Sequence, residues 1–158
     1  MARALLRIGG MDNSTAISTL NTLIAICHDG ESGFTTAAGA VKTVHVKGLF
    51  ERFSRQRAEM ARELESQVRK LGGTPSTGGS VTGAIHHGWM NIKSLVTGGD
   101  ESAIIAEAER GEDAAKAAFQ AALKEPLPAG ARELIEQQAA IVKVAHDEVR
   151  ALEKSHAH

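Results

Sequence analysis

Apolar residues recur every three or four positions along most of this chain, which is the spacing of amphipathic α-helices. A shorter run of the same kind lies within residues 81–97 and predicts a brief additional helix. The four long runs predict helices over residues 14–42, 44–71, 101–124 and 129–154.

Two long helices, a connection of about 30 residues with its own short helix, and two further long helices form the pattern of a four-helix bundle with one long crossover. The chain has 158 residues, 42% of them hydrophobic but only 3% aromatic, which favours an all-α fold over a β-rich one. We expect one domain over residues 1–158, with loose tails at 1–13 and 155–158.

The two halves of the chain resemble each other at a constant offset of 81 residues. Gly30-Glu31 corresponds to Gly111-Glu112, and Gln56 corresponds to Gln137, without a gap. Apolar positions of both helix pairs match at the same offset. The sequence therefore predicts a duplicated helical hairpin, in which each hairpin buries its apolar stripe against the other.

Polar residues interrupt the predicted inward stripes at matching heights. The interruptions are Glu31, Gln56, Glu112 and Gln137. A buried carboxylate must be paired, protonated or bound to a cation. We expect these four residues to form one polar core layer, with Gln56, Gln137 or Arg57 donating hydrogen bonds to the glutamates.

The fourth stripe also yields an expectation about a histidine. We expect His146 to be half-exposed, because neighbouring residues are better core candidates. The predicted inward residues of this helix are Leu134, Ile141, Ala145, Val149 and Leu152.

Several segments are similar to a bacterial family of uncharacterised four-helix proteins placed in the ferritin-like superfamily. They are LIAICHDGESGFTTAA, FSRQRAEMARELE, GSVTGAIHHGWMNIKSLVTGGDESAIIAEAERGEDAAKAAFQAAL and VAHDEVRAL. The resemblance covers residues 17–153. It implies a ferritin-like four-helix bundle and a link to stress responses, but that family is itself a domain of unknown function.

The wider superfamily implies a dinuclear iron or manganese centre, built from one Glu on each of two helices and a Glu-x-x-His motif on each of the others. Glu31 and Glu112 match the single glutamates. The motif itself is missing, because the second helix reads Gln56-x-x-Glu59 and the fourth Gln137-x-x-Ala140. An intact oxidase or ferroxidase centre is therefore not expected.

A different metal site stays open. His28 and Glu31 are one turn apart on the first helix, and Glu109 and Glu112 hold the equivalent positions on the third. These oxygen and nitrogen ligands would suit iron, manganese or zinc. The competing interpretation, which we favour, is that no cofactor is bound and that Glu31 and Glu112 belong to a structural polar layer.

Charge and composition exclude other classes of function. A formal net charge of −1 gives no field to hold nucleic acid or an acidic membrane. The lone Cys27 lies in an apolar run and reads as a buried thiol, which fits a reducing cytoplasm. The loop GGTPSTGG lacks the Gly-Lys-Ser/Thr ending of a phosphate loop. His86-His87 reads as a surface pair.

Three classes of function remain. The chain is a non-catalytic, partner-binding bundle, a metal-binding protein with redox or metal-buffering activity, or an oligomeric architectural subunit. The last would use an exposed apolar strip of Ile85, Trp89 and Ile92 on the crossover. We expect the first, and therefore no enzyme activity.

Overall fold

The computed structural model of the protein describes residues 13–77 and 88–156. All regular structure in these ranges is helical, and the four predicted long helices are confirmed to within two residues at each end. The elements are α2 (Asn13–Ala40), α3 (Val44–Lys70), α4 (Ile92–Gly98), α5 (Glu101–Ala122) and α6 (Ala129–Ser155).

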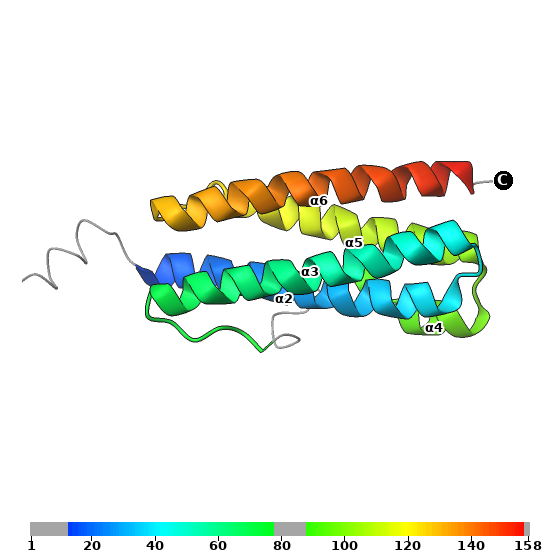
Figure 1. The fold of residues 1–158 in the computed structure, drawn as a ribbon, viewed down its shortest axis with the longest axis horizontal. Coiled ribbons are helices and arrows are strands. Elements are labelled where there is room, and N and C mark those ends of the chain that lie inside the picture. Colours follow the sequence, from blue (N-terminus) through cyan, green and yellow to red (C-terminus); the bar gives the residue numbers. More distant parts are fainter. Residues whose placement is uncertain (1–12, 78–87, 157–158) are drawn as a thin grey trace, which may run out of the picture.

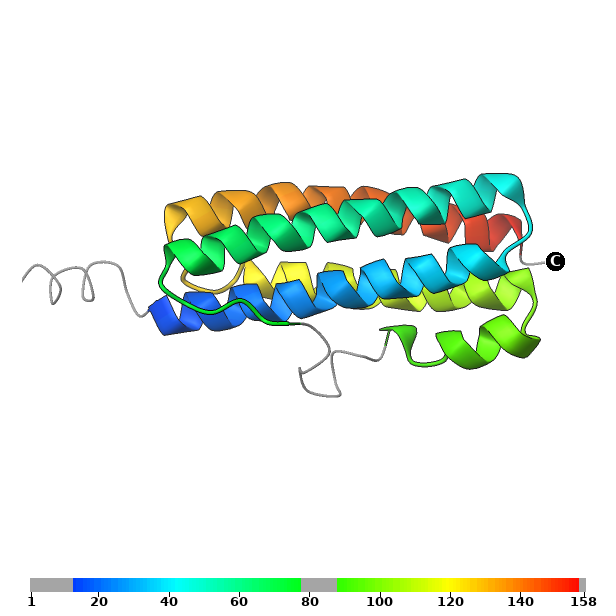
Figure 2. The same ribbon diagram turned by 60° about the horizontal axis from the view of Figure 1, so that its bottom comes forward.

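The long helices form two antiparallel hairpins, α2 with α3 and α5 with α6 (Figure 1). Between the hairpins, α2 packs closely on α5, whereas α3 and α6 touch less extensively. α3 ends and α5 begins at opposite ends of the bundle, and the crossover helix α4 lies beside α2 and α5 (Figure 2). The predicted arrangement of two hairpins and one long crossover is confirmed.

The crossover differs in detail from the single amphipathic helix predicted over its length. Residues 78–87, which include His86 and His87, lie outside the described residues. The described part begins with a short 3₁₀ turn at Gly88 and Trp89, and the α-helix starts only at Ile92.

Two apolar clusters fill the core, one toward each end of the bundle. One contains Leu23, Leu64 and Phe119, and the other contains Phe34, Phe53 and Ile105. Between them, at mid-length, the buried residues Arg57, Glu112 and Gln138 bring polar groups into the interior. A polar zone therefore separates two hydrophobic halves.

The first half of α6 is turned by one residue from its predicted register. Leu134 and Ile141 are only half-buried, while their neighbours Ile135 and Val142 are fully buried. Each pair of adjacent aliphatic residues offers two stripes that differ by about 100° around the helix, and packing selects the second. The prediction that His146 is half-exposed is also wrong, because this side chain is buried together with the predicted inward residue Ala145.

Burial follows the internal offset of 81 residues. Ile24 and Ile105, Gly30 and Gly111, and Val68 and Val149 are buried in both halves. The helix starts agree less closely, because α5 begins seven residues and α6 four residues later than the offset from α2 and α3 predicts. The matching burial supports the predicted duplication.

Glu101 fastens the turn between α2 and α3 to the start of α5. Its carboxylate accepts hydrogen bonds from the backbone of Lys42 at 2.8 Å and from the hydroxyl of Thr43 at 2.5 Å. Burial would raise the pKa of Glu101, but these bonds, the Thr43 amide and His156 lower it to about 2. The carboxylate is therefore a charged clasp between the hairpins.

Candidate functional site

A bidentate ion pair occupies the polar zone at mid-bundle. Arg57 of α3 donates from Nη1 to Oε2 of Glu112 at 2.8 Å and from Nη2 to Oε1 at 2.5 Å. Both side chains are inaccessible to solvent, with exposed fractions of 1% and 0%. Burial would lower the pKa of Arg57, but the charge and hydrogen bonds of Glu112 raise it. The guanidinium therefore stays charged inside the core.

Small neighbours create the space that Arg57 occupies. A Cβ atom on Gly30 of α2 would lie 3.0 Å from Nη1 of Arg57 and 3.3 Å from its Cγ. The ring of Phe34 lies 5.6 Å from the guanidinium carbon. Cys27 is buried nearby, and this burial raises the pKa of its thiol to about 12. The expectation that Cys27 is a buried thiol is confirmed.

The polar layer does not form as predicted. Glu112 is buried, but the side chain of Glu31 is 42% exposed, and Gln137 lies on the outer surface of α6. Gln56 is half-buried, and its Oε1 has no hydrogen-bond partner. In α3 and α6 alike, the inward polar residue is the next one along the chain, Arg57 or Gln138.

Gln138 is the residue that replaces Gln137 in the interior. Its side-chain amide donates to the carbonyl oxygen of Met60 at 3.2 Å and to Oε1 of Glu63 at 2.9 Å. Arg57 and Gln138 are themselves related by the offset of 81 residues. The sequence named Arg57 as one possible donor to the glutamates, and its hydrogen bonds to Glu112 confirm this. Gln138 was missed, because periodicity alone does not distinguish it from the adjacent Gln137.

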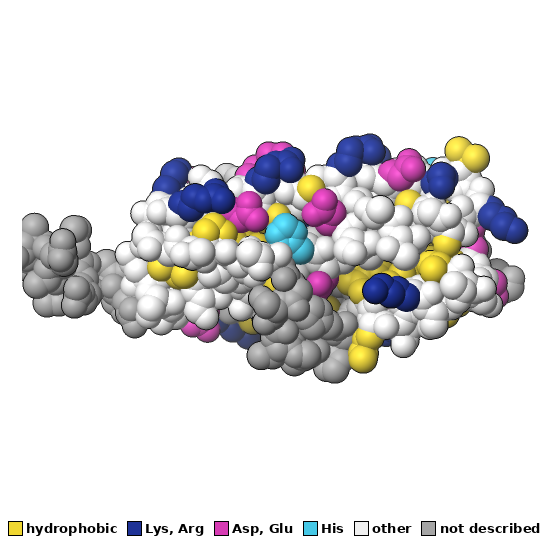
Figure 3. Space-filling model, turned by 90° about the horizontal axis from the view of Figure 1, so that it is seen from below, with side chains coloured by type: hydrophobic (Ala, Val, Ile, Leu, Met, Phe, Trp, Pro, Cys, Tyr) yellow, Lys and Arg dark blue, Asp and Glu magenta, His cyan; other side chains and the backbone are white. Residues whose placement is uncertain are grey.

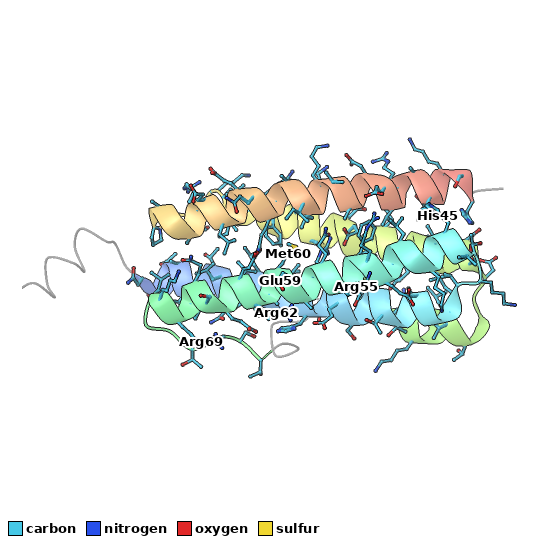
Figure 4. The ribbon with its side chains drawn as sticks, viewed as in Figure 1. His45, Arg55, Glu59, Met60, Arg62 and Arg69 are labelled. Carbon is cyan, nitrogen blue, oxygen red and sulfur yellow. The ribbon has the colours of Figure 1, made fainter. Side chains whose placement is uncertain are left out.

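The residues at mid-bundle do not fit a dinuclear metal centre. Glu112, one of the two expected carboxylate ligands, is already neutralised by Arg57. Glu59 of the Gln56-x-x-Glu59 sequence is exposed and pairs with Arg62 on the outside of α3; both are labelled in Figure 4. A metal ion here would have to displace the guanidinium and would find no histidine in the superfamily's positions.

The four residues of the alternative metal site lie in three separate places. Glu112 belongs to the core pair. His28 and Glu31 lie on the α2–α3 hairpin, where His28 is 3.6 Å from Glu31 and 3.5 Å from Glu65. Figure 3 shows a histidine beside acidic side chains at mid-length of this face. Glu109 lies on the other hairpin, so the predicted set is not one site.

Glu109 instead joins a second cluster, between α5 and α6. One ligand atom from each of Glu109, Asp113 and His146 lies within 4.8 Å of the others. His146 Nε2 is 2.7 Å from Oδ1 of Asp113. A hydrogen bond with Glu153, together with burial, raises the pKa of Glu109 to about 7.

Trp89 of the crossover packs into the seam between α2 and α5. A Cβ atom on Gly33 would lie 2.2 Å from the ring of Trp89, and one on Gly111 would lie 2.3 Å from it. The Trp89 ring stacks edge-on against Phe34 at 5.0 Å between centroids. The backbone amide of Asn91 donates to buried Glu107 at 2.7 Å. Gly33 in the first hairpin and Gly111 in the second therefore leave the space that the Trp89 ring occupies.

Comparison with known sequences gives a family but no activity. Among the described helices, none is long and apolar enough to cross a membrane. No curated protein matches the chain. The sequence profile of one family, described as "Domain of unknown function (DUF2383)", matches residues 15–125, which is more than half of the chain. The protein therefore belongs to the DUF2383 family of unknown function.

Proposed function

We propose that this protein is a non-catalytic, ferritin-like helical bundle that acts through its surface. The supporting observation is the buried bidentate pair of Arg57 and Glu112. In ferritin-like oxidases the corresponding space between the helices holds two metal ions. Here a fixed guanidinium supplies the positive charge that such ions would bring.

The energetics of the pair support a structural role. Removing one partner of a buried ion pair costs about 3 to 5 kcal/mol, because the other charge is left unpaired in the core. A site whose main carboxylate is bound in this way cannot exchange ligands or bind dioxygen without breaking the pair. The surrounding apolar clusters offer no replacement partner.

The architectural alternative has lost part of its support. It required an exposed apolar strip on the crossover, formed by Ile85, Trp89 and Ile92. Ile85 lies outside the described residues, Trp89 packs into the α2–α5 seam, and Ile92 is buried. Among the described residues of this strip, Ile92 is buried and Trp89 is only partly exposed, so neither presents a fully exposed apolar side chain.

The proposal is tested by metal analysis and by an iron oxidation assay. Protein purified without chelators is compared with a Glu31→Ala, Glu112→Ala double variant for iron and manganese content. We expect no difference between the two, and no oxidation of Fe²⁺ by the wild type above the buffer rate. Two metal ions per chain that disappear in the double variant would overturn the proposal.

A further inference from the structure

We propose that the outer face of the α5–α6 hairpin binds one divalent transition-metal cation through Glu109, Asp113 and His146. This site is separate from the core pair and independent of the proposed function. The three ligand residues come from two helices, so a bound cation would link α5 to α6.

The backbone already brings the ligand atoms together. Glu109 and Asp113 are one turn apart on α5, so their carboxylates project from the same side of the helix. His146 reaches them from α6, and one ligand atom of each residue lies within 4.8 Å of the others. Bonds to zinc measure about 2.0 to 2.2 Å for nitrogen and oxygen ligands. Modest rotations of the two carboxylates would bring all three atoms to these distances.

The histidine is held in a suitable orientation. Only 4% of its side chain is exposed, and Nδ1 is 3.1 Å from Oδ1 of Asp147, while Nε2 faces Asp113. Metal-bound histidines almost always donate their second ring N–H to a carboxylate or carbonyl oxygen, which fixes the tautomer. Asp147 is placed to accept that hydrogen bond and leave Nε2 for the metal.

The charge of this face favours a cation. A third acidic residue, Glu153, lies close to Glu109 and Asp113 and hydrogen-bonds to Glu109. Lys143 is engaged with Asp147 at 2.9 Å, and Arg150 offsets only part of the remaining negative charge. A divalent cation would neutralise carboxylates that are now crowded together.

The other hairpin carries the same pair with the residue types exchanged. The offset of 81 residues relates His28 to Glu109 and Glu65 to His146. Both hairpins therefore place a histidine and a glutamate opposite each other at the same height, at 3.5 Å in the first hairpin. The counterpart of Asp113 is Ser32, so only the α5–α6 hairpin has a third ligand at this position.

The ligand set indicates the class of metal. One imidazole and two or three carboxylate oxygens suit zinc, manganese or iron(II), whereas a site for calcium or magnesium is built from oxygen alone. We therefore choose Zn²⁺ and Co²⁺ as probes. Co²⁺ also reports its coordination through visible absorption bands.

In the test, a chelator first removes bound metal from the full-length protein. The protein is then titrated with Zn²⁺ and Co²⁺, and binding is measured by calorimetry and visible absorption. We expect one site per chain that is lost, or weakened at least 10-fold, in a Glu109→Gln, Asp113→Asn variant. His146→Gln should change the Co²⁺ spectrum. Glu133→Gln, Glu136→Gln removes the same two charges from an exposed part of α6 and should bind as the wild type does.

The histidines elsewhere in the chain are the same in the wild type and in the two carboxylate variants, so their binding cancels in that comparison. Circular dichroism checks that each variant is folded. Equal affinity in the wild type and the Glu109→Gln, Asp113→Asn variant would overturn the proposal, and so would an absence of a stoichiometric site in the wild type. Neither result would bear on the core pair, because its residues are unchanged.

Discussion

Glu31 and Glu112 occupy corresponding positions in the two hairpins, and each directly follows a buried glycine. Nevertheless the side chain of Glu31 is 42% exposed, while that of Glu112 is completely buried. The difference arises from what fills the space beside each glycine. Arg57 lies against Gly30 and pairs with Glu112, whereas Trp89 lies against Gly111.

One core cation can balance one buried carboxylate. The counterpart of Arg57 in the second hairpin is Gln138, whose amide is used by Met60 and Glu63. A carboxylate buried at the position of Glu31 would therefore be an unpaired charge, which is costly in the interior. Glu31 lies at the surface beside His28 instead. A repeated sequence pattern thus yields equivalent helices but unequal core chemistry.

The largest expected effect is the loss of the core pair. Glu112→Ala should lower the free energy of unfolding by about 3 to 5 kcal/mol, because Arg57 would remain charged and buried without a partner. Glu31→Ala should change it by less than about 0.5 kcal/mol. Chemical denaturation followed by circular dichroism measures both.

An Arg57→Met, Glu112→Leu double variant separates charge from packing. Replacing a buried pair by apolar residues of similar size is often neutral or stabilising, so we expect this variant to recover most of the loss. Equal losses in the free energy of unfolding for Glu31→Ala and Glu112→Ala would contradict the inferred difference between the two glutamates.

The second comparison concerns the glycine beside the crossover. Gly111→Ala places a methyl group into the Trp89 ring, and we expect a cost of about 1 to 3 kcal/mol from overpacking. The emission of Trp89, the chain's only tryptophan, should shift as the ring leaves the seam. Gly48→Ala is the control, because nothing lies within 4 Å of its added Cβ. It should stabilise helix α3 by roughly 0.5 to 1 kcal/mol.

Adjacent glutamines on α6 give a third comparison. Gln138→Ala removes the donor to Met60 and Glu63 and should cost about 1 to 3 kcal/mol. Gln137→Ala acts on an exposed side chain and should stay within about 0.5 kcal/mol of the wild type. The same denaturation measurement applies. A larger loss at Gln137 would mean that α6 has the register predicted from the sequence.

The smallest effect concerns pH at the clasp between the hairpins. The pKa of Glu101 is about 2 in the folded protein, below its ordinary value of 4.5. Its contribution to stability is therefore present above about pH 4.5 and is lost as the pH falls toward 2. Glu101→Gln should cost less than about 1 kcal/mol at pH 7, because the group is partly screened by solvent. The difference in stability between the wild type and Glu101→Gln should be smaller at pH 2.5 than at pH 7. A difference that stays constant would show that the lowered pKa of Glu101 does not contribute to stability.

The sequence alone determined the helices, their hairpin pairing and the burial of Cys27 and Glu112. Each follows from local information, because a 3.6-residue apolar period and terminal Gly and Pro residues define where a helix forms and which broad side faces inward. Glu112 was identified because it interrupts an apolar stripe, but the same signal wrongly placed Glu31 in the interior.

The tertiary structure decided the details that depend on rotation by one residue. The pairs Leu134-Ile135 and Ile141-Val142 allow two nearly equal stripes, and only packing against α3 and α5 selects Ile135 and Val142. The choice of Arg57 over Gln56 has the same origin. The burial of Arg57 also requires Gly30 of α2 and Glu112 of α5 to contact the same side chain. The spacing of residues along a single helix cannot encode such a contact between three helices.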